Sequence, residues 1–254
     1  MDELRGSAPT PAAAPSPAAM SDIGSLLRTR QLTLGEFLSG AWQIFSERFA
    51  TIAAVTLSVA IPVHAVMMLA GGQQANRILS AMLIAAAGAA GLLSTLAVIL
   101  IADRAVAGEL LSWGDAFAGA IERWTSALLV SVIGIVIVVP LMLLIIPGII
   151  WASYYVFALQ AAALRDKTGK EALDRSKRLV RGSWGWGRVF LLLLLLGLMG
   201  QAITYGVAWV PGILVGPVIG GAIREVLGSV VGSFSTVLFT LIFLNCDARD
   251  LPAS

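Results

Sequence analysis

Cysteine, histidine and charge are all scarce in this sequence of 254 residues. The single cysteine, Cys246, excludes a disulfide within one chain, and the single histidine, His64, excludes a metal site built from several histidines of one chain. Charged residues make up only 13 % of the chain, about half the fraction that is typical of a soluble domain. The 17 basic and 15 acidic residues nearly balance, which argues against a nucleic-acid partner.

Apolar residues, in contrast, make up 58 % of the chain, and the mean hydropathy is +0.88. They gather in runs of about 20 residues, the length that crosses a bilayer as a helix. The runs predict six membrane spans, at about 50–70, 78–102, 126–146, 147–164, 187–208 and 224–245. Residues 209–222 contain Pro211, Pro217 and several glycines, and the pattern leaves open whether they form a hairpin turn or a broken helix.

We expect the chain to have three parts: a disordered tail over 1–31, one polytopic membrane domain over 32–246 and a short cytoplasmic tail over 247–254. Alanine, proline and serine dominate residues 1–21, a composition that is typical of disorder. The glycines and glutamines of residues 71–74 predict a short turn between the first two spans.

Three charged, amphipathic stretches lie outside the spans, each before a pair of them, at about 33–49, 111–125 and 168–182. In each, a hydroxyl residue is followed three positions later by an acid, as in a helix capping box. The pairs are Thr33 and Glu36, Ser112 and Asp115, and Thr168 and Glu171. Because two spans follow each stretch, the sequence predicts an all-α integral membrane protein of three repeats, each a cytoplasmic surface helix plus a transmembrane hairpin. Chance agreement among short amphipathic helices is the alternative.

The basic residues are distributed asymmetrically about the predicted spans. All of them except Arg77 and Arg224 lie on one side of the six-span arrangement. Basic loops favour the cytoplasm, so we expect a multi-pass protein of the cytoplasmic membrane with both termini inside the cell. The outer connections are short and nearly uncharged, which argues against a site outside the membrane.

The most charged stretch, residues 168–182, is predicted to lie flat on the cytoplasmic surface of the membrane. Each basic residue near anionic lipid contributes about 1 kcal/mol to binding. The candidate contacts to lipid headgroups are Lys170, Arg175, Lys177, Arg178 and Arg181. The alternative is that these residues only set the membrane topology and bind no particular ligand.

A second set of candidates lies within the spans themselves. His64 is ionisable and falls inside the first span, which makes it a functional candidate, although no acid lies clearly within any span. The alternative is a neutral histidine that shares a hydrogen bond near the outer interface. Tyr155, Gln160 and Gln201 complete a candidate intramembrane polar site; side chains of this kind also tie helices together.

One set of motifs resembles a known family over about residues 30–250. The motifs are Pro147-Gly148, Ala172-Leu173, Arg175-Ser176, Arg178-Leu179-Val180, Gly182, Trp184, Phe243-Leu244, Asp247 and Arg249. Together they are similar to the bacterial membrane domain found attached to some glycerophosphoryl diester phosphodiesterases and, more often, standing alone. The resemblance implies a six-helix protein of the bacterial inner membrane. The phosphodiesterase's catalytic barrel is absent from this sequence, so the hydrolase activity is not implied.

These observations favour a protein without catalytic machinery. We find no acid–base pair, metal-ligand cluster or activated nucleophile in the sequence, and we expect no enzyme activity and no cofactor. The leading hypothesis is an accessory or scaffold component that interacts with anionic lipids, with another membrane protein or with its own copies. The alternative is a small-solute or lipid transporter: the internal repeat supports it, and the lack of buried charges counts against it. A water-filled cavity would favour transport, and a closed, dry bundle would favour the scaffold.

Overall fold

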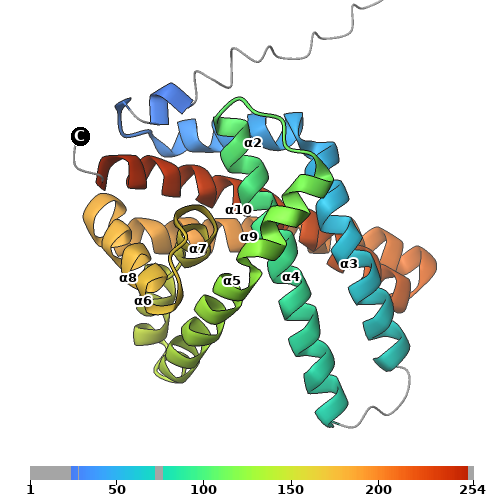
Figure 1. Cartoon of the computed structure of the whole chain (residues 1–254). Helices are drawn as coiled ribbons and strands as arrows, with labels where there is room; N and C mark the ends of the chain where they lie inside the picture. Colours follow the sequence, from blue (N-terminus) through green and yellow to red (C-terminus); the bar gives the residue numbers. More distant parts are fainter. Residues whose placement is uncertain (1–23, 28, 72–76, 251–254) are drawn as a thin grey trace, which may run out of the picture.

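The computed structural model describes residues 24–27, 29–71 and 77–250, and it is helical with no strand in those ranges (Figure 1). The helices are α2 (Leu34–Glu47), α3 (Phe49–Gly71), α4 (Arg77–Val106), α5 (Trp113–Met142), α6 (Ile146–Tyr154), α7 (Ala158–Arg165), α8 (Gly169–Leu179), a π-helical turn (Val180–Trp184), α9 (Trp186–Val215) and α10 (Pro217–Asp250). The prediction of an all-α protein is confirmed. A helix satisfies its backbone hydrogen bonds internally, as a spanning segment in a bilayer requires.

Six helical segments of the described chain are long and apolar enough to cross a membrane. They are Phe49–Met68, Arg77–Val106, Trp113–Met142, Ile146–Arg165, Trp186–Gly206 and Ile223–Asp250. Each overlaps one predicted span, so the prediction of six spans is confirmed at this level. Large apolar side chains such as Ile78, Ile135 and Leu191 are exposed on these helices, as expected for a surface that faces lipid. The chain has the features of a multi-pass membrane protein.

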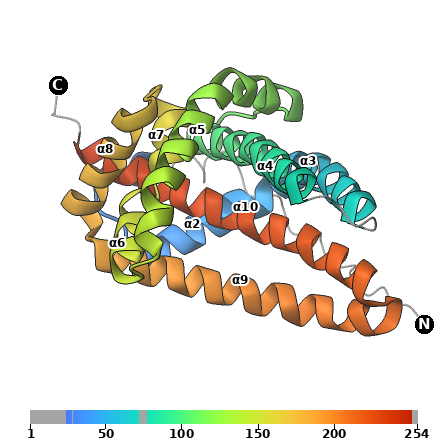
Figure 2. The same cartoon turned by 90° about the horizontal axis from the view of Figure 1, so that it is seen from below.

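Helix α10 lies at the centre of the fold, between α9 and the hairpin formed by α3 and α4 (Figure 2). Its second half is deeply buried: Val237, Leu238, Leu241, Ile242 and Phe243 all belong to the core. Helix α2 packs on the same half of α10 and contributes Phe37 and Ile44. The C-terminal end of α10 lies beside α8 in both views (Figures 1 and 2). Residues from both ends of the chain therefore meet at one end of the molecule.

The second predicted surface helix is not a separate element. Residues 113–142 form the single helix α5, because no proline interrupts the hydrogen bonding before Pro140. Ser112 caps its N-terminus as expected, since the Ser112 hydroxyl oxygen accepts from the Asp115 N–H at 3.2 Å. The second unit thus lacks an independent surface helix, and the threefold repeat stays a prediction.

The predicted fourth span, 147–164, is divided into α6 and α7 by a break at residues 155–157. Residues 209–222 are helical on both sides of Gly216, so the turn between the last two spans lies at that glycine. Its φ of +89° is a conformation that side chains disfavour and glycine adopts readily. The predicted turn at 71–74 falls mostly outside the described residues, as does the tail over 1–21.

Both predicted tails pack more extensively than expected where the structure describes them. Leu27 and Leu32 are buried. The Asn245 side-chain amide of α10 donates to the Leu27 carbonyl at 2.7 Å and to the Arg30 carbonyl at 2.9 Å. At the other end, α10 continues to Asp250, so residues 247–250 are helical and Asp247 is buried. The packed domain therefore extends beyond residues 32–246 on both sides.

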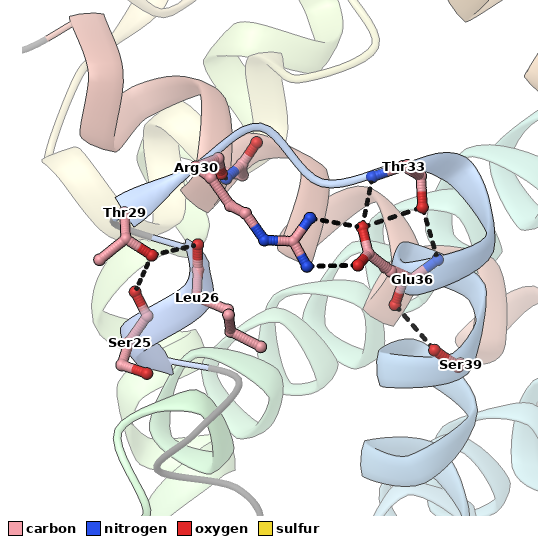
Figure 3. Close-up of polar contacts among 8 residues, drawn as sticks. Ser25, Leu26, Thr29, Arg30, Thr33, Glu36 and Ser39 are labelled. Carbon is pink, nitrogen blue, oxygen red and sulfur yellow. Dashed lines mark hydrogen bonds and ion pairs between the residues drawn. The ribbon is translucent and has the colours of Figure 1, made fainter.

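The predicted capping box at the start of α2 is confirmed (Figure 3). The Glu36 N–H donates to the Thr33 hydroxyl oxygen at 3.4 Å, and the Thr33 N–H donates to the Glu36 carboxylate at 2.8 Å. The Arg30 guanidinium also donates to both carboxylate oxygens. The hydrogen bonds from Arg30, followed by those from Thr33, lower the pKa of Glu36 from 4.5 to about 2.

We expect the contribution of Glu36 to stability to depend on pH. Because its pKa is lowered in the folded protein, the contribution is fully present above about pH 4.5 and is lost as the pH falls toward about 2. The difference in Tm between the wild type and Glu36→Gln should shrink across that window and disappear below it. Thermal unfolding in detergent over a pH series measures this. A Tm difference that stays constant from pH 6 to pH 2 would contradict the expectation.

Candidate functional site

The charged stretch singled out in the sequence forms α8, with Thr168 at its N-cap position. The predicted capping box does not form here, because the Thr168 side chain makes no capping hydrogen bond. Gly169, directly after it, has a φ of +51°, which changes the geometry of the first turn. The helical path also does not end at Gly182. It continues as a π-helical turn to Trp184 and stops at Gly185, whose φ is +75°.

Helix α8 has one buried side and one exposed, basic side. The buried side consists of Ala172, Leu173, Ser176 and Leu179. Lys170, Arg178 and Arg181 are exposed. Two of the cations lie over aromatic rings of α6: Lys177 Nζ is 4.3 Å from the centroid of Trp151, and the Arg181 guanidinium is 5.0 Å from that of Tyr154. Such contacts orient a cation at the edge of an apolar region.

Arg175 has a different environment from the other basic residues of α8. Its side chain is only 13 % exposed. Its Nε donates to Asp247 Oδ1 at 3.0 Å, and its Nη1 pairs with Asp250 Oδ2 at 2.8 Å. Arg165 Nε donates to the second oxygen of Asp247 at 2.6 Å. Arg175 therefore ties α8 to the end of α10, which leaves the other four predicted residues for contact with lipid.

Ser176 joins α8 to the break between α6 and α7. Its hydroxyl donates to the Tyr154 carbonyl at 2.7 Å, and its oxygen accepts from the Phe157 N–H at 3.0 Å. Both backbone groups lie where the helical hydrogen bonding is interrupted. One buried side chain thus satisfies a donor and an acceptor that would otherwise lack partners. The Arg175-Ser176 motif holds three helices together.

A cavity of about 780 Å³ lies between α3, α4 and α10, a volume in the range of small-molecule sites. Its polar lining residues are Thr56, His64, Ser94, Thr95, Glu225, Ser229, Ser233 and Thr236. The remaining lining is apolar or glycine. A second cavity, of about 680 Å³, lies between α9 and α10 and includes Gln201, Tyr205 and Arg224. Glu225 lines both cavities.

His64 has an acidic neighbour in the folded chain. Its Nε2 lies 3.7 Å from Glu225 Oε2, and its Nδ1 lies 2.6 Å from the Ala60 carbonyl oxygen. Glu225 lies at the start of the last predicted span, 224–245, and was not among the predicted site residues. The packing of α3 against α10 brings the two residues together.

The four predicted intramembrane residues do not form one site. His64 lines the first cavity and Gln201 the second, whereas Tyr155 and Gln160 line neither of them. Gln160 is buried on α7, and its Oε1 has no hydrogen-bond partner among the described residues.

The residues that sequence reasoning missed lie mainly on α10. Glu225, Ser229, Ser233 and Thr236 are spaced by four, four and three positions, so they share one helical face. This regular spacing of polar residues within an apolar span can be recognised in the sequence.

Both cavities contain polar groups that can contact a ligand. The first cavity has a carboxylate, an imidazole and hydroxyls from α3, α4 and α10. The second has an amide, a phenol, a guanidinium, hydroxyls and the same Glu225 carboxylate. No group of three or more His, Cys, Asp or Glu side chains within the described ranges is arranged to hold a metal ion. Comparison of the chain with protein-family models, with curated proteins and with solved structures finds no match.

Proposed function

We propose that this chain is a non-enzymatic accessory or scaffold component of the bacterial cytoplasmic membrane, and that it binds anionic lipid headgroups along α8. Both termini and α8 face the cytoplasm in this proposal. The asymmetric distribution of basic residues supports that orientation. The resemblance of the motif over 172–182 to a bacterial membrane domain supports the proposed location. In the cell, the partners are anionic lipids together with another membrane protein or further copies of this chain.

The exposed cations of α8 carry the proposal. Lys170, Arg178 and Arg181 are exposed, while the opposite side of the helix is buried. The helix lies between two segments that are able to span a membrane, Ile146–Arg165 and Trp186–Gly206. At about 1 kcal/mol for each basic residue, three cations are sufficient for a marked preference for anionic lipid, reduced by the exposed acids Glu171 and Asp174.

Transport of a small solute or lipid is the second candidate function. The cavity between α3, α4 and α10 favours it, because a closed bundle has no such space. The proximity of His64 and Glu225 also weakens one objection to transport, since a histidine within one span lies 3.7 Å from an acid at the start of another.

We expect the triple variant Lys170→Gln, Arg178→Gln, Arg181→Gln to bind phosphatidylglycerol at least tenfold more weakly than the wild type. The loss of about 3 kcal/mol of attraction, less the relief from neighbouring acids, sets this size. Native mass spectrometry in detergent, with phosphatidylglycerol and phosphatidylcholine in competition, measures the retained lipid.

A matched control removes the same charge elsewhere. The variant Arg77→Gln, Arg104→Gln, Arg249→Gln also loses three exposed arginines, from α4 and α10. We expect it to retain phosphatidylglycerol like the wild type. Equal retention by the α8 variant and the wild type would refute the proposed role of α8. An equal loss in both variants would point to total charge rather than to α8, which also contradicts the proposal.

A further inference from the structure

We propose that the cavity between α3, α4 and α10 binds a primary alkylammonium compound, with its ammonium group between His64 and Glu225 and its apolar chain between α3 and α4. This inference goes beyond the role proposed for α8 and rests on different residues. It follows from the hydrogen-bond acceptors that remain unused in the cavity lining, from the charge of Glu225 and from the apolar groove that adjoins the cavity.

The α10 hydroxyls that line the cavity already donate hydrogen bonds to carbonyl groups of their own helix. Ser229 donates to the Glu225 carbonyl at 2.9 Å, Ser233 to the Ser229 carbonyl at 3.0 Å, and Thr236 to the Gly232 carbonyl at 3.2 Å. A hydroxyl has one proton to donate, and its oxygen can still accept. This face of α10 therefore presents acceptors to the cavity.

Two of the hydroxyls on the facing helices, those of Thr56 and Thr95, also donate within the protein. Thr56 Oγ1 lies 2.8 Å from Ser233 Oγ; because Ser233 donates elsewhere, Thr56 is the donor of this bond. Thr95 of α4 donates to the Gly91 carbonyl at 3.0 Å. Acceptors therefore outnumber free donors in the cavity lining, where Ser94 keeps its hydroxyl proton, and this favours a ligand with hydrogen-bond donors.

The gap between His64 and Glu225 requires a donor as well. A carbonyl oxygen only accepts, so a His64 ring with a single proton carries it on Nδ1, which faces Ala60. Nε2 then has a lone pair that faces the Glu225 carboxylate across 3.7 Å. Two acceptors at that separation form no hydrogen bond with each other. A group that donates to both, as a primary ammonium can, completes the arrangement.

The charge at this position favours a cation. Among the described residues that line the cavity, Glu225 is the one acid. The neighbouring Arg224 lines the second cavity instead, where its guanidinium is 5.3 Å from the ring centroid of Tyr205. Arg224 pairs with Oε1 of Glu225 at 3.4 Å, whereas Oε2 is the oxygen nearest His64. Oε2 is therefore the oxygen left for a bound cation.

The apolar part of the ligand is defined by a neighbouring groove. Val63, Met67 and Ala87 line both the polar cavity and a smaller pocket of about 290 Å³. The other residues of that pocket are Pro62, Val66, Leu83, Ala86 and Ala90, all apolar. Apolar chains gain free energy in such surroundings in proportion to the area that they bury. A charged head beside an apolar groove fits an amphiphile with one alkyl chain.

The decisive experiment compares three ligands that share an octyl chain and differ in their head group. Isothermal titration calorimetry of the full chain in lipid nanodiscs, with empty nanodiscs subtracted, would use octylammonium, octyltrimethylammonium and octyl sulfate. We expect saturable binding of octylammonium and at least tenfold weaker binding of the other two, because one lacks N–H donors and the other has the wrong charge. Equal binding of octyltrimethylammonium, or no saturable binding of octylammonium, would overturn the proposal.

A variant then locates the site. We expect Glu225→Gln to weaken octylammonium binding at least tenfold, and the matched control Glu122→Gln, at an exposed position of α5, to leave it unchanged. Unchanged binding by Glu225→Gln would overturn the placement of the ammonium group. The comparison of ligands needs only the wild type, so it remains decisive if the variant does not fold.

Discussion

Replacing Asp247 with asparagine is expected to lower the free energy of unfolding by about 3 kcal/mol, within the range measured when one partner of a buried ion pair is removed. Asp247 is fully buried and accepts from both Arg165 and Arg175. Arg165 is 43 % exposed and can turn toward water when its partner is lost. The Arg175 side chain is only 13 % exposed and cannot turn toward water, so its lost contact with Asp247 accounts for most of the expected loss of stability. It keeps Asp250, which places the expected loss at the lower end of the range.

Chemical unfolding in detergent, followed by circular dichroism, measures this effect. The matched control is Glu109→Gln, which breaks the exposed pair between Glu109 and Arg104. Exposed pairs contribute about 0–1 kcal/mol, so this variant should unfold nearly like the wild type. If Asp247→Asn lowers the free energy of unfolding by less than about 1 kcal/mol, then the ion pairs of Asp247 with Arg165 and Arg175 do not join α7, α8 and α10 in the way described.

Replacing Ser176 with alanine is expected to lower the free energy of unfolding by about 2–4 kcal/mol. The substitution removes both hydrogen bonds at the break between α6 and α7, and leaves the Phe157 N–H and the Tyr154 carbonyl without that partner. A buried polar group that loses its partner costs about 1–3 kcal/mol. The volume change is small, so most of the effect comes from the hydrogen bonds.

The same unfolding experiment tests this expectation, with Ser46→Ala as its control. Ser46 is exposed on α2 and donates to a carbonyl of its own helix, and exposed changes of this kind stay within about 0.5 kcal/mol. Threonine at position 176 retains the hydroxyl and should recover part of the loss. Equal stability of Ser176→Ala and the wild type would show that water or another group satisfies the break.

The motif that resembles a bacterial membrane domain gains a physical interpretation from these contacts. Ala172, Leu173 and Leu179 are buried, Arg175 pairs with Asp247, and Ser176 holds the break. These residues therefore stabilise the packing of α8 on its neighbours. Arg178 is an exposed basic member of the motif on α8, and it remains available for contact with a headgroup.

The sequence by itself determined the features that depend on neighbouring residues. Six spans follow from the length and apolarity of local runs, since a bilayer selects helices by these properties. The capping box at Thr33 and Glu36 and the cap at Ser112 are likewise local, because a cap involves residues three positions apart. The sequence placed the breaks between elements less well: it divided residues 113–142, where no proline ends the helix before Pro140, and missed the break between α6 and α7.

The tertiary structure alone decided which polar residues meet. His64 and Glu225 come from α3 and α10, and Arg165, Arg175 and Asp247 come from α7, α8 and α10. No periodicity within one helix reveals such pairs, because they depend on which faces of distant helices pack together. For the same reason, the cavity beside α10 was not predicted, although its row of polar residues is visible in the sequence. Local patterns specify helices, whereas the packing between helices creates the sites.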